Sequence, residues 1–181
     1  MEVNDNIIKE LNKELSLLLY KLFVTNTYAM AFQREDGKYI TKYLPISEYL
    51  IEEMLNQNGS IGCYQQCYKS DMVKWICFDF DSPNKEEPDL KGIYEGIIVP
   101  LKKICDGYGI RYLTEFSGRR GIHLWIVFSH LIPKNKAFLI LTLLKNKLLD
   151  QIGGLGDTNL DSFPATDSSV SVGRNRPPRA A

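Results

Sequence analysis

The sequence lacks the features that mark secreted, membrane-spanning or strongly basic proteins. Its formal net charge is +0, because Lys+Arg and Asp+Glu number 22 each. Any grip on nucleic acid must therefore come from local basic patches rather than from an overall positive field. No apolar run reaches the length that a bilayer requires, and the first residues lack the basic end and apolar stretch of a signal peptide. We expect a cytoplasmic protein that makes no membrane contact.

Histidine and cysteine are also scarce. His123 and His130 are the only two histidines, and their spacing does not match the His-hydrophobic-His pair of rolling-circle nucleases. Cys63 and Cys67 have the spacing of a zinc half-site, but no second cysteine pair or close histidine pair completes it. We expect free thiols in a reducing compartment, with structural zinc as the open alternative.

Hydrophobic periodicity predicts an α+β protein with two modules. Residues 1–70 are expected to form an N-terminal α/β module, and residues 71–181 a second module packed against it. In the first module, apolar residues at helical spacing and an Asp-Gly turn predict two helices and three strands. The helices are expected at residues 5–23 and 45–57, and the strands at 28–34, 39–43 and 60–68.

The second module has the element order βαββαβ, the plan of ferredoxin-like and RNA-recognition-motif (RRM-like) folds. We expect a sheet order of 4-1-3-2, in which the first strand lies between the third and the fourth. Asp89 is a plausible cap of the first helix, and Pro100 is expected to bend it. The strands are expected at residues 73–81, 110–116, 122–128 and 169–172, and the helices at 90–105 and 133–152.

This plan gathers acidic residues at one corner of the sheet. Asp79 and Asp81 end the first strand, His123 begins the third, and Asp167 precedes the fourth. Alternation puts Asp79 and Asp81 on the face away from the helices, about 7 Å apart. Such carboxylates can hold Mg²⁺ or Mn²⁺, although an Asp-x-Asp pair is also common as a solvated strand end. Asp161 competes with Asp167 as a third ligand.

A basic glycine-rich segment joins the second and third strands. Its two glycines permit a tight turn with free backbone amides, and its serine and two arginines suit a triphosphate; a plain basic hairpin tip is the alternative. His123 can donate a hydrogen bond to a phosphate oxygen. Arginines near the end of the chain can hold phosphates of nucleotide or template. The expected phosphate-binding residues are Ser117, Gly118, Arg119, Arg120, His123, Arg174 and Arg176.

These motifs together resemble those of the archaeo-eukaryotic primase superfamily. The resemblance rests on Phe78-Asp79-Phe80-Asp81, on Ser117 to His123, and on Thr166-Asp167 with Arg174 and Arg176 beyond. It implies a primase core in which an α/β module joins an RRM-like half. It also implies two Mg²⁺ or Mn²⁺ ions on Asp79, Asp81 and Asp167, with the segment from Ser117 to His123 on the incoming nucleotide. The Arg-x-Arg-Pro-Pro string departs from the usual third motif.

Other stretches are similar to primase-polymerases of CRISPR loci and of mobile or defence elements, namely residues 59–82 and Phe163 to Asp167. We therefore expect a DNA or RNA primase-polymerase, and we leave open that it is the catalytic piece of a longer protein. Its expected partners are NTP or dNTP, a single-stranded template with primer, and helicase, CRISPR adaptation or other replication proteins. The alternatives are a non-catalytic RRM-like nucleic-acid-binding module and a metal-dependent nuclease using the same acids.

Overall fold

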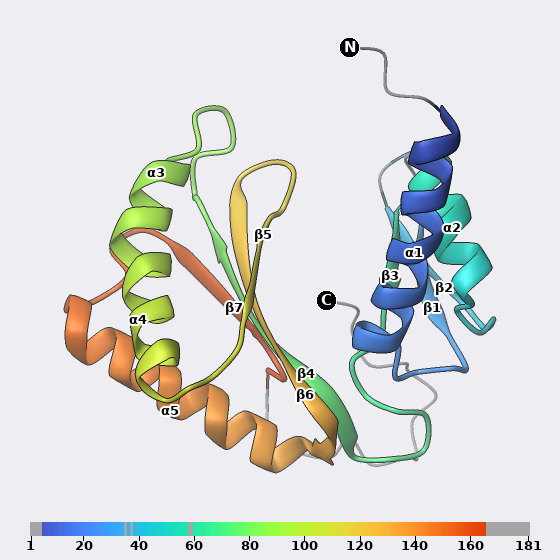
Figure 1. The fold of residues 1–181 in the computed structure, drawn as a ribbon. Helices are drawn as coiled ribbons and strands as arrows, with labels where there is room; N and C mark the ends of the chain where they lie inside the picture. The colour runs from blue at the N-terminus through green and yellow to red at the C-terminus, as the bar shows by residue number, and fades with distance from the viewer. Residues whose placement is uncertain (1–4, 35, 37, 58–59, 166–181) are drawn as a thin grey trace. The chain divides into compact units, whose positions relative to one another are not determined.

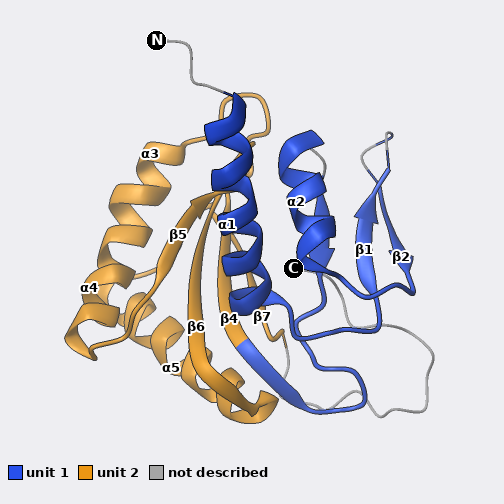
Figure 2. Ribbon diagram, turned by 45° about the vertical axis from the view of Figure 1, so that its right-hand side comes forward, with its two compact units in different colours: residues 1–74, 170–181 blue, residues 75–169 orange. Residues whose placement is uncertain are grey.

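The structure is a computed structural model, and it describes residues 5–34, 36, 38–57 and 60–165. The described chain forms two compact units, one containing the residues up to Lys74 and the other beginning at Trp75 (Figure 2). Helices and antiparallel sheets occur in both, so the predicted mixed α and β class is confirmed. No helix among the described residues is both long and apolar enough to cross a bilayer.

The first unit pairs two helices with a small antiparallel sheet of order β2-β1-β3. The predicted first helix is confirmed, but much of its apolar stripe is exposed, including Leu11 at 58%. The unit's core instead centres on Met30, Ile46 and Ile51. The elements are α1 (Asp5–Phe23), β1 (Met30–Gln33), β2 (Tyr39–Lys42), α2 (Glu48–Gln57) and β3 (Ile61–Cys63).

The predicted strand over residues 60–68 ends early, at Cys63. Beyond it the backbone carbonyls of Tyr64 and Gln65 accept hydrogen bonds from the Thr25 hydroxyl, at 3.2 and 2.7 Å. Side-chain partners thus replace part of the strand pairing that alternation alone predicts.

The second unit is a four-stranded sheet of order β5-β6-β4-β7, and its helical segments lie on one face of that sheet (Figure 1). The strands are β4 (Met72–Asp81), β5 (Leu113–Phe116), β6 (Gly121–Pro133) and β7 (Asn159–Phe163). The helical segments are α3 (Leu90–Ile93), the π-helical turn η1 (Tyr94–Ile98), α4 (Val99–Gly107) and α5 (Lys134–Ile152).

The fourth strand is not the one the sequence suggested. Residues 159–163, where no strand was expected, form β7 and pair antiparallel with β4. The expected strand at residues 169–172 lies outside the described residues. The strand order itself follows the 4-1-3-2 plan, with β7 in the fourth place.

The predicted helix at residues 90–105 is confirmed in a modified form. Asp89 caps it as expected, since its Oδ1 accepts the Gly92 amide at 2.8 Å. Instead of a simple bend, a π-helical turn precedes Pro100, and the Val99 amide bonds to the Tyr94 carbonyl. Proline has no amide hydrogen to donate, and a widened turn is one way a helix accommodates it.

The helix-facing side of the second unit's sheet forms its core, as alternation predicted. Side chains of β4 and β6 interleave there with those of α4 and α5, leaving the opposite face to Asp79 and Asp81. The core side chains are at most 4% exposed: Ile76, Phe78, Phe80, Leu124, Ile126, Leu101, Leu141, Leu144 and Leu148.

Candidate active site

A row of four ionisable side chains crosses the sheet of the second unit, one from each strand. Glu115 of β5 pairs in register with His123 of β6, and Asp79 of β4 pairs with Asp161 of β7. His123 in turn faces Asp79, with Nε2 to Oδ1 at 3.3 Å. Directly paired residues point to the same face of an antiparallel sheet, so the order acid, imidazole, acid, acid is fixed by strand register.

The imidazole of His123 sits between two carboxylates. Its Nδ1 is 3.0 Å from Glu115 Oε2, and the same oxygen accepts the Trp125 indole N–H at 2.8 Å. Burial lowers the pKa of His123, but the negative charges of Asp79 and Glu115 and the hydrogen bond to Glu115 outweigh it and raise the pKa to about 9. The hydrogen bond from His123 in turn holds the pKa of Glu115 below its usual value. At neutral pH the site therefore contains a protonated imidazole that can donate from both nitrogens.

One carboxylate oxygen of Asp79 is buried without a hydrogen bond. Its Oδ1 is buried and makes no hydrogen bond of acceptable geometry, although His123 Nε2 lies 3.3 Å away. Leaving a buried carboxylate oxygen without a hydrogen bond is costly unless another cation or donor satisfies it. The oxygen thus favours a site that accepts a positively charged ligand.

Asp81 stands two residues further along the same face of β4, at its end. Burial raises the pKa of Asp81, and the negative charges of Asp79 and Asp161 act in the same direction. Arg120 and His123 act in the opposite direction but do not cancel that shift. Asp79, Asp81 and Asp161 therefore share this edge of the sheet, where nearby positive charge would reduce the repulsion between their carboxylates.

The hairpin between β5 and β6 is tied at its base by its own serine. The Ser117 hydroxyl accepts the Gly121 amide at 3.0 Å, and the Ser117 amide donates to the Gly121 carbonyl at 3.0 Å. Gly118 adopts φ +86°, a conformation that other residues rarely take. Gly121 packs so closely that an added Cβ would meet Asp81 Oδ1 at 2.4 Å.

The two arginines of the hairpin have different surroundings. Arg120 contacts Asp81 Oδ2 at 2.6 Å and donates to the Ser82 carbonyl at 2.8 Å, while the Ser82 amide returns a bond to the Arg120 carbonyl. Arg119 is exposed, and within the described part of the chain it has no ion pair or hydrogen bond. Of the two arginines predicted to bind phosphate, Arg120 is paired with Asp81, and Arg119 is exposed to solvent and available to a ligand.

The donor set suits a hard divalent cation, because the side chains gathered here offer carboxylate oxygens and one of those oxygens is buried without a hydrogen bond. In the described residues no group of three His, Cys, Asp or Glu side chains is close enough to hold an ion as it stands. Asp81 is paired with Arg120 at 2.6 Å. For Asp81 to help coordinate a cation, its carboxylate must leave Arg120 or contact both groups.

Several predicted residues lie outside the described residues, namely Asp167, Arg174 and Arg176. Asp161, the competing third acid, lies on β7 directly opposite Asp79. Cys63 and Cys67 carry free thiols, and the described residues offer no zinc-binding group around them.

Sequence reasoning missed Glu115, which the structure places beside His123. The signal was present, because a hairpin that turns at residues 117–121 places residue 115 opposite residue 123. It also missed the strand that carries Asp161 to Asp79.

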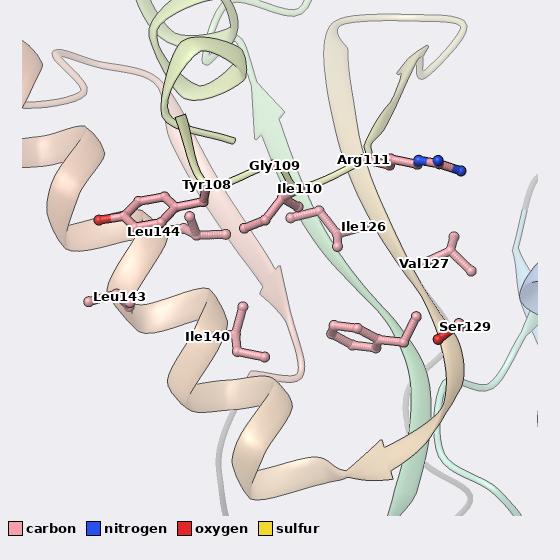
Figure 3. Close-up of a pocket in the computed structure, with 11 residues that line it drawn as sticks. Tyr108, Gly109, Ile110, Arg111, Ile126, Val127, Ser129, Ile140, Leu143 and Leu144 are labelled. Atoms are coloured by element: carbon pink, nitrogen blue, oxygen red, sulfur yellow. The ribbon is translucent and has the colours of Figure 1, made fainter. Parts of the chain in front are cut away.

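A pocket of about 650 Å³ lies elsewhere in the second unit, between β6 and α5. Figure 3 shows Ile140, Leu143 and Leu144 of the helix on one side of it and Ile126 of the sheet on the other. Its lining includes no Asp, Glu or His, so it has none of the groups that the acidic row provides.

Comparisons with known proteins show the family and a shared fold. A family model described as "TOTE conflict system, Archaeo-Eukaryotic Primase domain" matches residues 19–173. Among solved structures, the chain is similar to the "Polymerase Domain from Mycobacterium tuberculosis Ligase D in complex with DNA". That match has a TM-score of 0.61 and 11% sequence identity, covers 85% of this chain and 69% of that chain, and shows a shared fold. No curated protein matches the sequence.

Proposed function

Since the chain belongs to the archaeo-eukaryotic primase family, we propose that it is a template-directed primase-polymerase. It would transfer a nucleotidyl group from NTP or dNTP to a 3′ hydroxyl, forming a bond from that oxygen to the α-phosphorus and releasing pyrophosphate. The family supports the primase-like nucleotidyltransferase role. The observation that carries the finer proposal is the row of Glu115, His123, Asp79 and Asp161 beside the glycine-arginine hairpin.

The residues that would hold Mg²⁺ or Mn²⁺ are Asp79, Asp81 and a third carboxylate, Asp161 or Asp167. When bound, such ions supply positive charge against the triphosphate and the attacking oxygen. The buried Oδ1 of Asp79 supports this assignment. It accepts no hydrogen bond, and a bound cation would compensate for that loss.

The hairpin would bind the triphosphate of the incoming nucleotide. Arg119 is exposed and available for a phosphate oxygen, and the positive φ of Gly118 opens backbone amides at the tip. His123 would donate from Nε2, with Glu115 holding its other nitrogen and so fixing the ring plane. Arg120 would stay with Asp81 in the resting state and turn to phosphate when a cation takes the carboxylate.

Nucleic acid would be the second substrate. The similar structure is a polymerase domain in complex with DNA, and a template-directed transfer needs a template to select the nucleotide. Helicase and other replication partners, the CRISPR connection and membership in a longer protein stay predictions.

The test is nucleotide incorporation on a primed single-stranded template, with labelled NTPs or dNTPs and Mg²⁺ or Mn²⁺. We expect the wild type to extend the primer and the Asp79→Asn, Asp81→Asn double variant to lose extension while staying folded. Asp150→Asn is the matched control, since it makes the same change at an exposed carboxylate of α5. Extension by the double variant at the wild-type rate would contradict the proposal.

The same assay separates the rival functions. Strand cleavage without incorporation would favour the nuclease, and metal-independent binding without transfer would favour the binding module. Comparing Asp161→Asn with Asp167→Asn identifies the third acid. We expect the larger loss at Asp161, because it pairs directly with Asp79.

A further inference from the structure

Three exposed tyrosines gather on the surface of the first unit. Tyr28 precedes β1, Tyr43 follows β2 and Tyr68 lies beyond β3, and they are 45%, 59% and 45% exposed. The rings of Tyr28 and Tyr68 stack at a centroid distance of 4.0 Å and an interplanar angle of 14°, and the Tyr43 ring lies 5.7 Å from that of Tyr28. We call these three residues the tyrosine cluster.

The backbone under the cluster is held by buried side chains. Asn26 is 3% exposed, donates to the Gln66 carbonyl at 3.1 Å, and accepts the amides of Tyr28 and Ala29 at 2.9 and 3.1 Å. Thr25 bonds to two more carbonyls of the same neighbouring segment. The segments that carry Tyr28 and Tyr68 are therefore joined before any ligand arrives, and ordering them on binding would cost little.

A strained lysine stands next to the cluster. Ser70 donates its amide to the Cys67 carbonyl at 3.2 Å, which makes Tyr68 and Lys69 the two central residues of a β-turn. Lys69 has φ +56°, a conformation that glycine or asparagine usually takes at the second central position. Its Nζ lies 5.2 Å from the centre of the Tyr68 ring. Backbone strain at an exposed basic residue such as Lys69 points to a binding role for that residue.

We propose that the tyrosine cluster and Lys69 form a stacking platform for single-stranded nucleic acid. Tyrosine faces accept bases of any sequence, and a lysine beside them meets the phosphate backbone, the combination used by non-sequence-specific single-strand binders. Duplex would not fit, since its base faces are already stacked. The platform deepens the proposed function by assigning a contact for template, and it lies outside the acidic row.

The test is binding of a fluorescein-labelled oligothymidylate to the whole chain, followed by anisotropy in EDTA without nucleotide. Because stacking contributes strongly for each base, Tyr68→Ala should weaken binding about 5- to 100-fold. Tyr68→Phe keeps the ring face and should bind like the wild type. Tyr49→Ala, which removes an exposed tyrosine of α2, is the matched control and should also bind like the wild type.

Lys69→Gly provides a second and independent variant. Glycine accepts the positive φ without strain, so the variant should fold at least as well as the wild type. It should nevertheless bind more weakly, and the slope of log affinity against log salt should flatten by about 0.7, the value for one lost phosphate contact on single strands.

Wild-type affinity in both Tyr68→Ala and Lys69→Gly would overturn the inference. This holds even if the same tyrosines bind a protein partner instead. The readout needs no catalysis, so the two proposals can fail separately. If these variants extend primers and bind oligothymidylate like the wild type, the polymerase proposal survives and the platform proposal fails. If binding depends on the tyrosines but the wild type extends no primer, the platform proposal survives and the polymerase proposal fails.

Discussion

Adding one methyl group at Gly121 should damage the acidic edge more than any surface change of the same size. An alanine Cβ there would lie 2.4 Å from Asp81 Oδ1, 2.9 Å from the Phe80 carbonyl oxygen and 3.2 Å from Ser117 Oγ. The Asp81 carboxylate can rotate. The Phe80 carbonyl cannot move easily, because it belongs to a central strand and the Phe80 side chain is fully buried. Relief therefore requires that the start of β6 move, which also disturbs the contact between Asp81 and Arg120.

The size of the effect follows from two opposing contributions. Inserting a methyl group into a well-packed place typically costs about 1–3 kcal/mol. Replacing glycine by alanine also restricts the unfolded chain, which contributes about 0.4–1 kcal/mol in the opposite direction. We expect Gly121→Ala to lower the free energy of unfolding by about 1–2 kcal/mol.

Gly96→Ala is the matched control, since an added Cβ at Gly96 meets nothing within 4 Å. Gly96 is a helical position, and alanine should raise the stability there by about 0.5–1 kcal/mol. Urea unfolding followed by tryptophan fluorescence is the assay. Both tryptophans, Trp75 and Trp125, lie in the second unit with ring centroids 5.1 Å apart, so the signal reports on the unit that holds the site. If Gly121→Ala were as stable as Gly96→Ala, the packing argument would be refuted.

Four further outcomes follow from the structure. In metal-free protein, His123 has a pKa of about 9 against an ordinary 6.5, so its contribution to stability is complete below pH 6.5 and lost as pH rises through 9. The wild type should therefore lose unfolding free energy over that window relative to His123→Gln. Glu115→Gln should lower the pKa of His123, because one of its two carboxylate partners is neutralised, and an imidazole titration by NMR would show no change if the contact is absent. Burial raises the pKa of the Cys63 and Cys105 thiols to about 11, so iodoacetamide at pH 8 should modify them far more slowly in native than in guanidinium-unfolded protein. Asp161→Asn should stabilise the metal-free protein by up to about 1 kcal/mol, since it removes a carboxylate directly opposite another, and thermal melts in EDTA would contradict this by showing a loss.

Much of the site could be predicted because it depends on local rules. Alternation along a strand of ten residues puts Asp79 and Asp81 on the face away from the helices, and the buried Phe78 and Phe80 on the other face confirm it. The glycine-rich segment predicts a hairpin, and the hairpin brings His123 back beside the first strand.

The fourth strand could not be predicted in the same way. Residues 159–163 read Asn-Leu-Asp-Ser-Phe, in which asparagine and aspartate are poor strand formers. They become a strand because β4 offers an unpaired edge, which only the tertiary structure reveals. The ion pair between Arg120 and Asp81 is equally non-local, since it depends on how the hairpin packs on the end of β4.

The acidic row is a poor arrangement for folding alone, which is why it indicates function. Asp79 and Asp161 stand directly opposite each other, and like charges in that position destabilise a strand pair. Asp79 also keeps a buried oxygen without a hydrogen bond. His123 offsets part of this with its positive charge, but Glu115 is tied to the same imidazole. A cation would remove both defects at once, and it would then stabilise the folded chain by mass action. A divalent cation of the kind that the proposed nucleotidyl transfer would use is therefore expected to relieve the charge repulsion at this edge of the sheet.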